Sequence, residues 1–370
     1  MHIAVPKEVK DDEYRVAITP DGVHELTARH HTVHVQSGAG LGAGVTDDEY
    51  AAAGALVASD ADATWAAGEL VLKVKEPVAE EYHRLRPDQP LFTYLHLAAD
   101  KALTDELLAR RVTAIAYETV RTAAGSLPLL APMSEIAGRL ATQVGAATLL
   151  KTAGGRGILL GGVPGVAAGH VVIIGAGVAG MNAARIAAGM GARVTLLDTD
   201  AHALRAADRE LGGRVQTLSS NHLTCTHAVL DTDLVIGAVL VAGSRAPVLV
   251  ADDLVARMRP GSVLVDVAID QGGCFESSRP TTHKHPTYRV HDCVFYCVAN
   301  MPGAVPRTST YALTNVTLPY VLALADHGWR DALRADPTLA HGLNTHDGAV
   351  THPGVAAAHG LEETPVSDVL

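Results

Sequence analysis

The feature that most constrains the fold is a glycine-rich turn between an apolar strand and a helical stretch. The run Val171–Ile174 is followed by Gly175-Ala-Gly177-Val-Ala-Gly180 and then by MNAARIAAGMGA. In this spacing the first glycine permits a tight turn, and the second lets a phosphate approach the backbone at the helix N-terminus. The third glycine lets the helix lie close to the strand. The segment therefore predicts a βαβ unit that binds a dinucleotide.

An acidic residue follows this turn at the expected distance. The next predicted strand, RVTLLD, ends in Asp198, 18 residues after Gly180. The dinucleotide fingerprint has an acid about 20 residues after its glycines, where it accepts hydrogen bonds from the ribose hydroxyls. Because this carboxylate would repel a 2′-phosphate, NAD is expected rather than NADP. The alternative, a structural glycine turn with a solvated aspartate, does not account for strand, turn, helix and acid in one register.

Short β-branched runs alternate with helical stretches along the 370 residues. A chain of this length is expected to form two domains, and the alternation predicts doubly wound parallel sheets. The first series of strands is HIAVP, TVHVQS, ELVLKV, LFTYLHL and TAIAYE, and the second is HVVIIGAG, RVTLLD, DLVIGAVLV, SVLVDVAID and CVFYCVAN. The expected fold class is α/β, with two Rossmann-like domains.

Two long helical stretches, Leu130–Ala153 and Thr308–Asp326, are expected to join these domains. A discontinuous substrate domain would then comprise residues 1–129 and 308–370. The dinucleotide domain, residues 130–307, would be inserted in it, with the active site in the cleft between the two. The tail from Ala340 is rich in Gly, His and Thr, and we expect it to be partly ordered on the first domain.

Capping residues predict where several helices begin. Thr19-Pro20 combines an N-cap with a proline suited to the first helical position, and Thr46–Glu49 has the spacing of a capping box. The series Thr308-Ser309-Thr310 predicts the start of the second joining helix.

Composition and charge exclude several classes of partner. The formal net charge of −11 and the lack of a Lys/Arg cluster disfavour nucleic acid and anionic membranes. No stretch reaches the roughly 18 apolar residues of a membrane span, and the start MHIAVPKEVK lacks a basic leader with an apolar core, so a cytoplasmic location is expected. Small molecules or copies of the chain itself remain as partners. Four cysteines form no CxxC pair and are expected to be reduced and packed: Cys225, Cys274, Cys293 and Cys297.

Polar residues follow successive predicted strands at positions where α/β proteins bind ligands, beyond the carboxyl ends of the strands. Lys75 follows ELVLKV, His96 lies near the end of LFTYLHL, and Glu118 follows TAIAY, in steps of 21 and 22 residues. In the second domain Asp270 ends SVLVDVAID and Asn300 ends CVFYCVAN. We expect the two sets to face one another across the cleft.

These residue types suit an amino acid or 2-oxo acid substrate. Arg15, within EYRVAITP, can hold a carboxylate with a bidentate fork, and Lys75 adds a second positive charge. His96 has an unperturbed pKa of about 6.5, as a general acid and base requires, and Asp270 could assist proton transfer or orient a water. Taken singly, a solvated lysine, a structural histidine or a capping aspartate is common at such positions, so the hypothesis depends on the whole set.

The chain resembles the bacterial L-alanine dehydrogenases, near the mycobacterial type, over essentially its whole length. The segments that carry the resemblance are EYRVAITP, LVLKVKEP, LHLAAD, PLLAPMSEIAGR, GGVPGV, GAGVAG, VDVAIDQGG, FYCVANMPGAVPRTSTYALTN and ADHGW. The resemblance implies a two-domain homohexamer that oxidises L-alanine reversibly with NAD and water to pyruvate and ammonium; related members also reductively aminate glyoxylate. It further implies substrate binding by Arg15, Lys75 and Asn300, and proton transfer by His96 and Asp270.

The resemblance also implies a set of cofactor contacts. These are Ser134, Gly175, Gly177, Val178, Ala179, Gly180, Asp198, Ser220, Val239, Leu240, Val267, Ala268, Ile269, Asp270, Val298, Ala299, Asn300 and Met301. Where the family can carry Lys or Arg near the adenosine, this chain has Ala201, His202 and Ala203, which leaves that contact without a predicted residue. Some members bind Mg²⁺ through residues that match Glu118 and His327, which makes these two a candidate metal site.

Two other functions are compatible with parts of the sequence. The saccharopine and lysine-forming dehydrogenases resemble this layout but need room for a longer amino acid. The NAD-binding subunit of proton-translocating transhydrogenase resembles the chain in EYRVAITP and in the nucleotide half. His96 with Lys75, the terminal helical return and the lack of a membrane segment favour the dehydrogenase.

Overall fold

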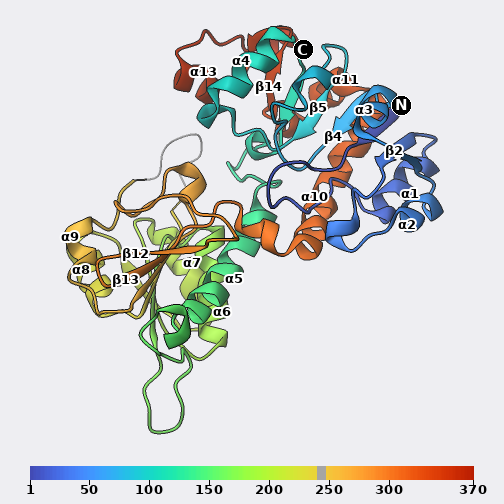
Figure 1. The fold of residues 1–370 in the computed structure, drawn as a ribbon. Coiled ribbons are helices and arrows are strands. Elements are labelled where there is room, and N and C mark those ends of the chain that lie inside the picture. Colours follow the sequence, from blue (N-terminus) through green and yellow to red (C-terminus); the bar gives the residue numbers. More distant parts are fainter. Residues whose placement is uncertain (240–246) are drawn as a thin grey trace. The chain divides into compact units, whose positions relative to one another are not determined.

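The computed structural model describes residues 1–239 and 247–370, which divide into two compact units (Figure 1). Unit 1 comprises Met1–Met133 and Val305–Leu370, and unit 2 comprises Ser134–Ala304. Unit 1 is thus discontinuous along the chain. Helix α5, Ala131–Thr148, begins in unit 1 and continues in unit 2.

Unit 1 is built on an eight-stranded sheet with the order β15-β14-β6-β5-β4-β1-β2-β3. The parallel strands are β1 His2–Val5, β2 Thr32–Gln36, β3 Leu56–Ala58, β4 Leu70–Leu72, β5 Leu91–Thr93 and β6 Ala114–Ala116. Strands β4, β5 and β6 are buried throughout, as in parallel sheets covered on both faces. The chain order reverses between β1 and β4, so the carboxyl ends of these two strands form a topological switch point.

The helices of unit 1 cover this sheet and include the predicted starts. They are α1 Pro20–Ala28, α2 Asp47–Ala52, α3 Ala61–Ala67, α4 Lys101–Ala109, α10 Pro306–His327, α11 Trp329–Ala335, α12 Pro337–Ala340, α13 Pro353–His359 and α14 Val366–Val369. Both predicted caps are confirmed, since Thr19 accepts a hydrogen bond from Gly22 N and Thr46 forms a capping box with Glu49.

Two expectations for the C-terminal part are wrong. Helix α10 begins at Pro306 and not at the Thr308-Ser309-Thr310 series, because proline has a backbone preset for the first helical position and lacks an N–H that would go unbonded there. The tail after Ala340 is more regular than expected. It forms the strands β14, Leu343–His346, and β15, Ala349–Val350, and β14 extends the sheet by antiparallel pairing with β6.

Unit 2 contains a seven-stranded sheet with the order β12-β13-β11-β10-β7-β8-β9, parallel except for β12. The strands are β7 His170–Ile174, β8 Arg193–Asp198, β9 Gln216–Ser219, β10 Leu234–Gly237, β11 Val263–Asp266, β12 Thr287–Val290 and β13 Cys293–Tyr296. Helices α6, Val178–Gly189, and α7, Ala201–Leu211, lie on one side of the strands, and α8, His222–Leu230, and α9, Asp252–Val255, on the other (Figure 1). The chain order reverses between β7 and β10.

The four cysteines are buried free thiols in unit 2, as expected. Burial raises the pKa of Cys293 and of Cys297 to about 11, so both stay protonated near neutral pH. Within the described part of the chain, no helix combines the length and the apolar character that crossing a bilayer requires.

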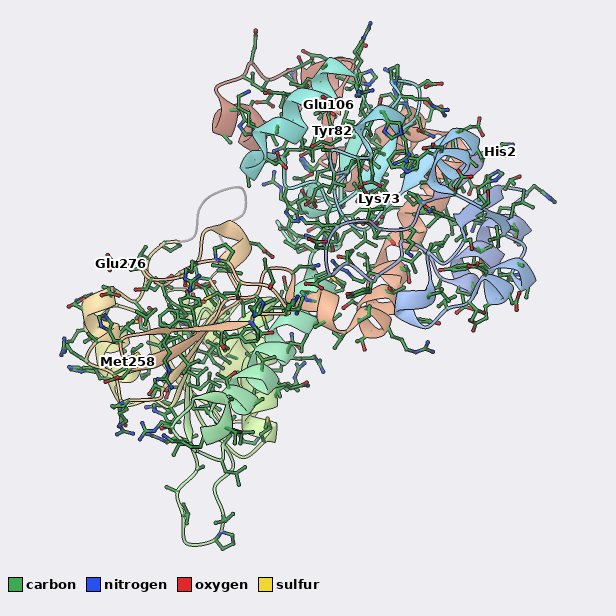
Figure 2. All side chains as sticks on the ribbon, viewed as in Figure 1. His2, Lys73, Tyr82, Glu106, Met258 and Glu276 are labelled. Carbon is green, nitrogen blue, oxygen red and sulfur yellow. The ribbon has the colours of Figure 1, made fainter. Side chains whose placement is uncertain are left out.

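A buried ion cluster lies in the loop that follows β4. Lys73, labelled in Figure 2, has no exposed surface, and its Nζ lies 3.1 Å from Glu8 Oε2 and 2.9 Å from Glu81 Oε1. Glu8 Oε1 also accepts a hydrogen bond from Val74 N, at 2.6 Å. Burial opposes the charge of Lys73, but the two carboxylates overcome it and raise its pKa; burial raises the pKa of Glu8 despite Lys73. The cluster therefore connects the loop after β1 to the loop that carries Lys75.

Replacing Lys73 with methionine tests how much this cluster stabilises unit 1. The Lys73→Met variant leaves Glu8 and Glu81 buried without their cation, so we expect the free energy of unfolding in urea to fall by about 3–5 kcal/mol. The control Lys101→Met removes an exposed pair with Asp105 and should change the unfolding free energy little. Equal losses in the two variants would contradict a special role for the buried cluster.

Candidate functional site

The four predicted residues of unit 1 follow the carboxyl ends of neighbouring parallel strands. Arg15, Lys75, His96 and Glu118 follow β1, β4, β5 and β6, which are neighbours in that order. Arg15 and Lys75 follow the two strands of the switch point, where α/β sheets bind ligands. The structure brings Lys75 and His96 together, with Nζ of Lys75 3.5 Å from Nε2 of His96. Lys75 is only 8% exposed. Because an ammonium group only donates, this contact requires His96 Nε2 to act as an acceptor.

Arg15 is buried and is held by a residue that sequence reasoning missed. Its Nε donates to Glu13 Oε1 at 2.7 Å, its Nη2 pairs with Glu13 Oε2, and its Nη1 lies 3.0 Å from Met133 Sδ. Burial opposes the charge of Arg15, but Glu13 overcomes this and raises the pKa, so Arg15 remains a cation. Glu13 thus occupies one edge of the guanidinium, and Met133 contacts Nη1. The signal in the sequence was the spacing of Glu13 two residues before Arg15.

His96 has an unusual backbone. It adopts the left-handed conformation with φ 53° and ψ 35°. Its N–H donates to Glu118 Oε1 at 2.6 Å, and Leu95 N–H donates to the same carboxylate at 3.2 Å. The imidazole stacks on Tyr94 at a centroid distance of 5.9 Å, and the buried Tyr94 hydroxyl donates to the Leu129 carbonyl. These contacts fix both the backbone and the ring plane of His96.

The glycine turn of unit 2 has the geometry of a phosphate cradle. Gly175 has φ 106°, and a Cβ there would lie 2.5 Å from Ala238 O. A Cβ on Gly180 would collide with the Gly175 carbonyl oxygen, whereas one on Gly177 would meet open space. Gly177 is also the N-cap of α6, and glycine has no side chain with which to cap the helix. Because helix N-terminal amides bind anions, the turn fits the pyrophosphate of a dinucleotide.

The Asp198 side chain is hydrogen-bonded to the glycine turn. Its carboxylate accepts hydrogen bonds from Ala176 N at 2.6 Å and from Asp200 N at 2.8 Å. An ionised carboxylate has about four lone-pair positions, so two remain for ribose hydroxyls. Ala201–Ala203, where the resemblance left the adenosine contact open, form the first turn of α7, and Asp200 caps this helix through His202 N.

The other predicted cofactor residues gather along the same edge of the sheet. Ser220 follows β9 and Val239 follows β10, while the segments Val267–Asp270 and Val298–Met301 follow β11 and β13. Leu240 lies outside the described residues. Ser134 lies in the first turn of α5, four residues before Gly138. A Cβ on Gly138 would collide with the Ala179 carbonyl oxygen, so α5 packs closely against the glycine turn here.

Asp270 and Asn300 lie close together in unit 2. Asp270 is exposed, and the Asn300 N–H lies 3.5 Å from its Oδ2. Asn300 is left-handed, with φ 59°, and its carbonyl contacts His283 Nε2 at 3.2 Å. The buried Asp266 holds the loop that carries Asp270, because its carboxylate accepts hydrogen bonds from Ala268 N and Cys274 N. Sequence reasoning missed His283 and Asp266, although the acid at the end of the strand VLVD was a usable signal for Asp266.

The structure does not bring Glu118 and His327 together. Glu118 lies beyond the carboxyl ends of β5 and β6, where its carboxylate is bonded to backbone amides. His327 is the last residue of α10 and follows Asp326. The Asp326 carboxylate lies 2.8 Å from Nε2 of His31, the residue just before β2. The two residues thus lie at opposite ends of parallel strands. The described residues contain no group of three or more His, Cys, Asp or Glu side chains that could hold a metal. The residues present do not fit the expected Mg²⁺ site within one chain.

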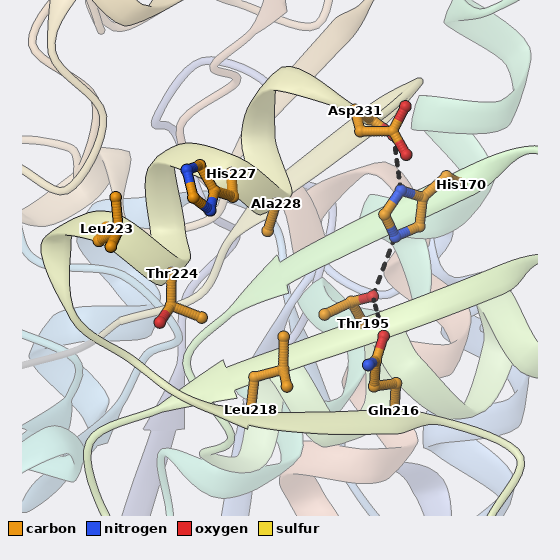
Figure 3. Close-up of a pocket in the computed structure, with 9 residues that line it drawn as sticks. All are labelled: His170, Thr195, Gln216, Leu218, Leu223, Thr224, His227, Ala228 and Asp231. Carbon is orange, nitrogen blue, oxygen red and sulfur yellow. Dashed lines mark hydrogen bonds between the residues drawn. The ribbon is translucent and has the colours of Figure 1, made fainter.

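A cavity of about 350 Å³ in unit 2 is separate from these residues (Figure 3). It lies toward the amino ends of the strands, because His170 begins β7 and Gln216 begins β9. His170 Nδ1 donates to the Asp231 carbonyl oxygen at 2.7 Å, and Nε2 lies 2.9 Å from Thr195 Oγ1. Burial lowers the pKa of His170, which favours a neutral ring. The predicted cofactor residues that the structure describes do not line this cavity.

Family models match most of the chain. The model described as alanine dehydrogenase/PNT, N-terminal domain, matches residues 4–137, and that described as alanine dehydrogenase/PNT, C-terminal domain, matches residues 141–353. The second match extends beyond unit 2 and includes α10 of unit 1.

Individual relatives agree with these matches. The chain is 61% identical to the alanine dehydrogenase of Mycobacterium tuberculosis, over all of both chains. A solved structure of an L-alanine dehydrogenase superposes with a TM-score of 0.94 at 52% identity, covering 97% of this chain and 99% of that one. The transhydrogenase structure from Sinorhizobium meliloti shares the fold, with a TM-score of 0.82 at 24% identity over 95% of this chain and all of that one. The chain belongs to the alanine dehydrogenase/PNT family.

Proposed function

We propose that this protein is an NAD-dependent alanine dehydrogenase, which converts L-alanine, NAD⁺ and water reversibly to pyruvate, ammonium and NADH. The observation that carries the proposal is the contact between Lys75 and His96, at 3.5 Å, on the switch-point edge of unit 1. A cation and a base side by side suit a substrate that has a carboxylate and loses a proton. The names of relatives with about 60% identity over their full length support the same activity.

We assign each residue of the set a role in this reaction. Lys75 and Arg15 hold the substrate carboxylate. His96, kept as an acceptor by Lys75, takes a proton from the water that attacks the imine and returns it when the carbinolamine collapses to pyruvate and ammonium. The glycine turn of unit 2 would hold NAD, which would supply the acceptor for the hydride of the alanine α-carbon. Asp270 assists proton transfer, and Asn300 contributes to substrate binding.

The cofactor part of the proposal depends on Gly177 and Asp198. The first turn of α6 would hold the pyrophosphate, and the Asp198 carboxylate would accept hydrogen bonds from the ribose hydroxyls. The same carboxylate repels a 2′-phosphate, which gives the preference for NAD over NADP.

The resemblance supports further proposals that the contacts of this chain do not address. They are assembly as a homohexamer, a cytoplasmic location and the reductive amination of glyoxylate. The mass of the assembly in solution, compared with the 38.5 kDa of one chain, tests the first of these. No role is proposed for Mg²⁺ on Glu118 and His327.

The activity is tested with the purified full-length chain. We expect NADH absorbance to increase when L-alanine and NAD are the only substrates, with ammonium as a product. L-lysine in place of L-alanine should give little NADH. Turnover with lysine-type substrates but none with alanine would refute the proposal in favour of a lysine-forming enzyme, and hydride exchange between nucleotides without alanine turnover would favour a transhydrogenase.

Replacing His96 with alanine should separate chemistry from cofactor binding. Because the base is removed while unit 2 is unchanged, we expect turnover of alanine to fall by a factor on the order of 10² or more. NADH binding, measured by fluorescence, should stay as in the wild type. The control His24→Ala changes an exposed histidine of α1 and should retain full turnover. Normal turnover in His96→Ala would remove His96 from the mechanism.

Replacing Asp198 with serine tests the cofactor preference. The loss of the carboxylate removes both the ribose acceptor and the repulsion of a 2′-phosphate, so the ratio of kcat/KM for NAD to that for NADP should fall roughly tenfold or more. Asp208→Ser, on the exposed face of α7, is the matched control. An unchanged ratio in Asp198→Ser would show that another residue sets the preference.

A further inference from the structure

The left-handed backbone of His96 needs an external cause. A non-glycine residue with φ 53° is uncommon, and the conformation persists only where surrounding contacts favour it. Strand β5 ends at Thr93, and a short helical turn begins at Leu97, so the chain changes direction within three residues. His96 is the residue at which this change of direction occurs.

Glu118 supplies contacts that favour this conformation. Its Oε1 accepts the N–H of His96 at 2.6 Å, and both of its oxygens lie within 3.3 Å of the Leu95 N–H. Two consecutive amides therefore point at one carboxylate, and hydrogen bonds to a charged acceptor are among the stronger ones. The pairing of Thr93 with Ala116 places Glu118, two residues after β6, beside the end of β5.

The metal partner expected for Glu118 does not lie beside it in this chain. The Glu118 carboxylate instead accepts hydrogen bonds from two backbone amides, Leu95 N–H and His96 N–H. The partner expected from the family resemblance, His327, lies near the amino end of β2, beside Asp326 and its contact with His31.

We propose that Glu118 is a positioning residue, whose carboxylate holds the His96 backbone in the left-handed conformation and so presents Nε2 of the imidazole to Lys75. The kinetic consequence rests on the proposed function. If the carboxylate is removed, the amides of Leu95 and His96 lose their shared acceptor, residue 96 is free to adopt another backbone, and the imidazole moves away from Lys75.

The test compares the wild type with Glu118→Gln and with a matched control, Glu106→Gln, which removes the ion pair with Arg110 on α4. Glutamine keeps the length of the side chain but replaces one acceptor oxygen with a donor. We expect turnover of alanine to fall roughly 10- to 100-fold in Glu118→Gln, because a displacement of about 1 Å of a reacting group costs on that order. NADH affinity should be unchanged, and the pH dependence of kcat/KM should shift as the contact of His96 with Lys75 is lost. Glu106→Gln should match the wild type in all three.

Crystal structures of the wild type and of Glu118→Gln give a readout that does not depend on the reaction. We expect residue 96 to leave the left-handed region in the variant and the distance between Lys75 Nζ and His96 Nε2 to increase. A variant with wild-type turnover, or with an unchanged His96 backbone, would overturn the proposal. If Glu118→Gln does not fold, Glu118→Asp, which keeps the charge at a shorter reach, takes its place in the same measurements.

Two controls separate this proposal from the alternatives. In the first, EDTA lowers the activity of the wild type and added Mg²⁺ restores it. If Glu118→Gln loses only this response to Mg²⁺, Glu118 is a metal ligand and the positioning role is wrong. If the wild type does not oxidise alanine, the proposed function fails, whereas the crystal structures still decide whether Glu118 holds the His96 backbone.

Discussion

In each unit, the first three strands lie side by side in chain order, and the fourth strand pairs with the other side of the first. Because all these strands are parallel, their carboxyl ends share one edge, and the loops on the two sides of the reversal diverge there. In unit 1 these loops carry Arg15 and Lys75, and in unit 2 they carry the glycine turn and Val239. The reversal of strand order thus determines where these predicted residues lie.

Carboxylates that are buried or partly buried set the local geometry at these edges. Glu13 holds Arg15, Glu118 holds the His96 backbone, and Asp266 holds the loop that carries Asp270. Lys73 with Glu8 and Glu81 fixes the loop of Lys75. Removing an acid from water is costly unless it is paired or hydrogen-bonded, so each of these groups restricts the loop around it to a conformation that satisfies its oxygens. The carboxylates thus orient the residues predicted to form the site.

The strands that the sequence did not predict lie at or next to sheet edges. Strands β3, β9 and β12 are outermost strands of their sheets. Leu56 of β3 is 55% exposed. Strand β14 depends on pairing with β6 for its place in the sheet. An edge strand needs no continuous apolar run, because one side of it faces solvent, so its sequence carries a weak signal. The central strands, which are buried on both faces, were predictable for the opposite reason.

The sequence by itself determined the α/β class, the inserted arrangement of the two units, the glycine turn with Asp198, and the series Lys75, His96 and Glu118 at strand ends. These features are local or periodic, and a short segment is enough to express them. Only the tertiary structure decided that Glu13 occupies one edge of Arg15, that Glu118 bonds to the backbone of His96, and that His327 lies far from Glu118. The outcomes for Glu118 and His327 depend on which strands are neighbours, because residues 22 or more apart in the chain meet only when the sheet has formed. Glu13 and Arg15 are two residues apart, and their pairing depends on how the loop after β1 packs. The glycine turn predicts that a dinucleotide binds, and the packing of unit 1 indicates which residues orient His96.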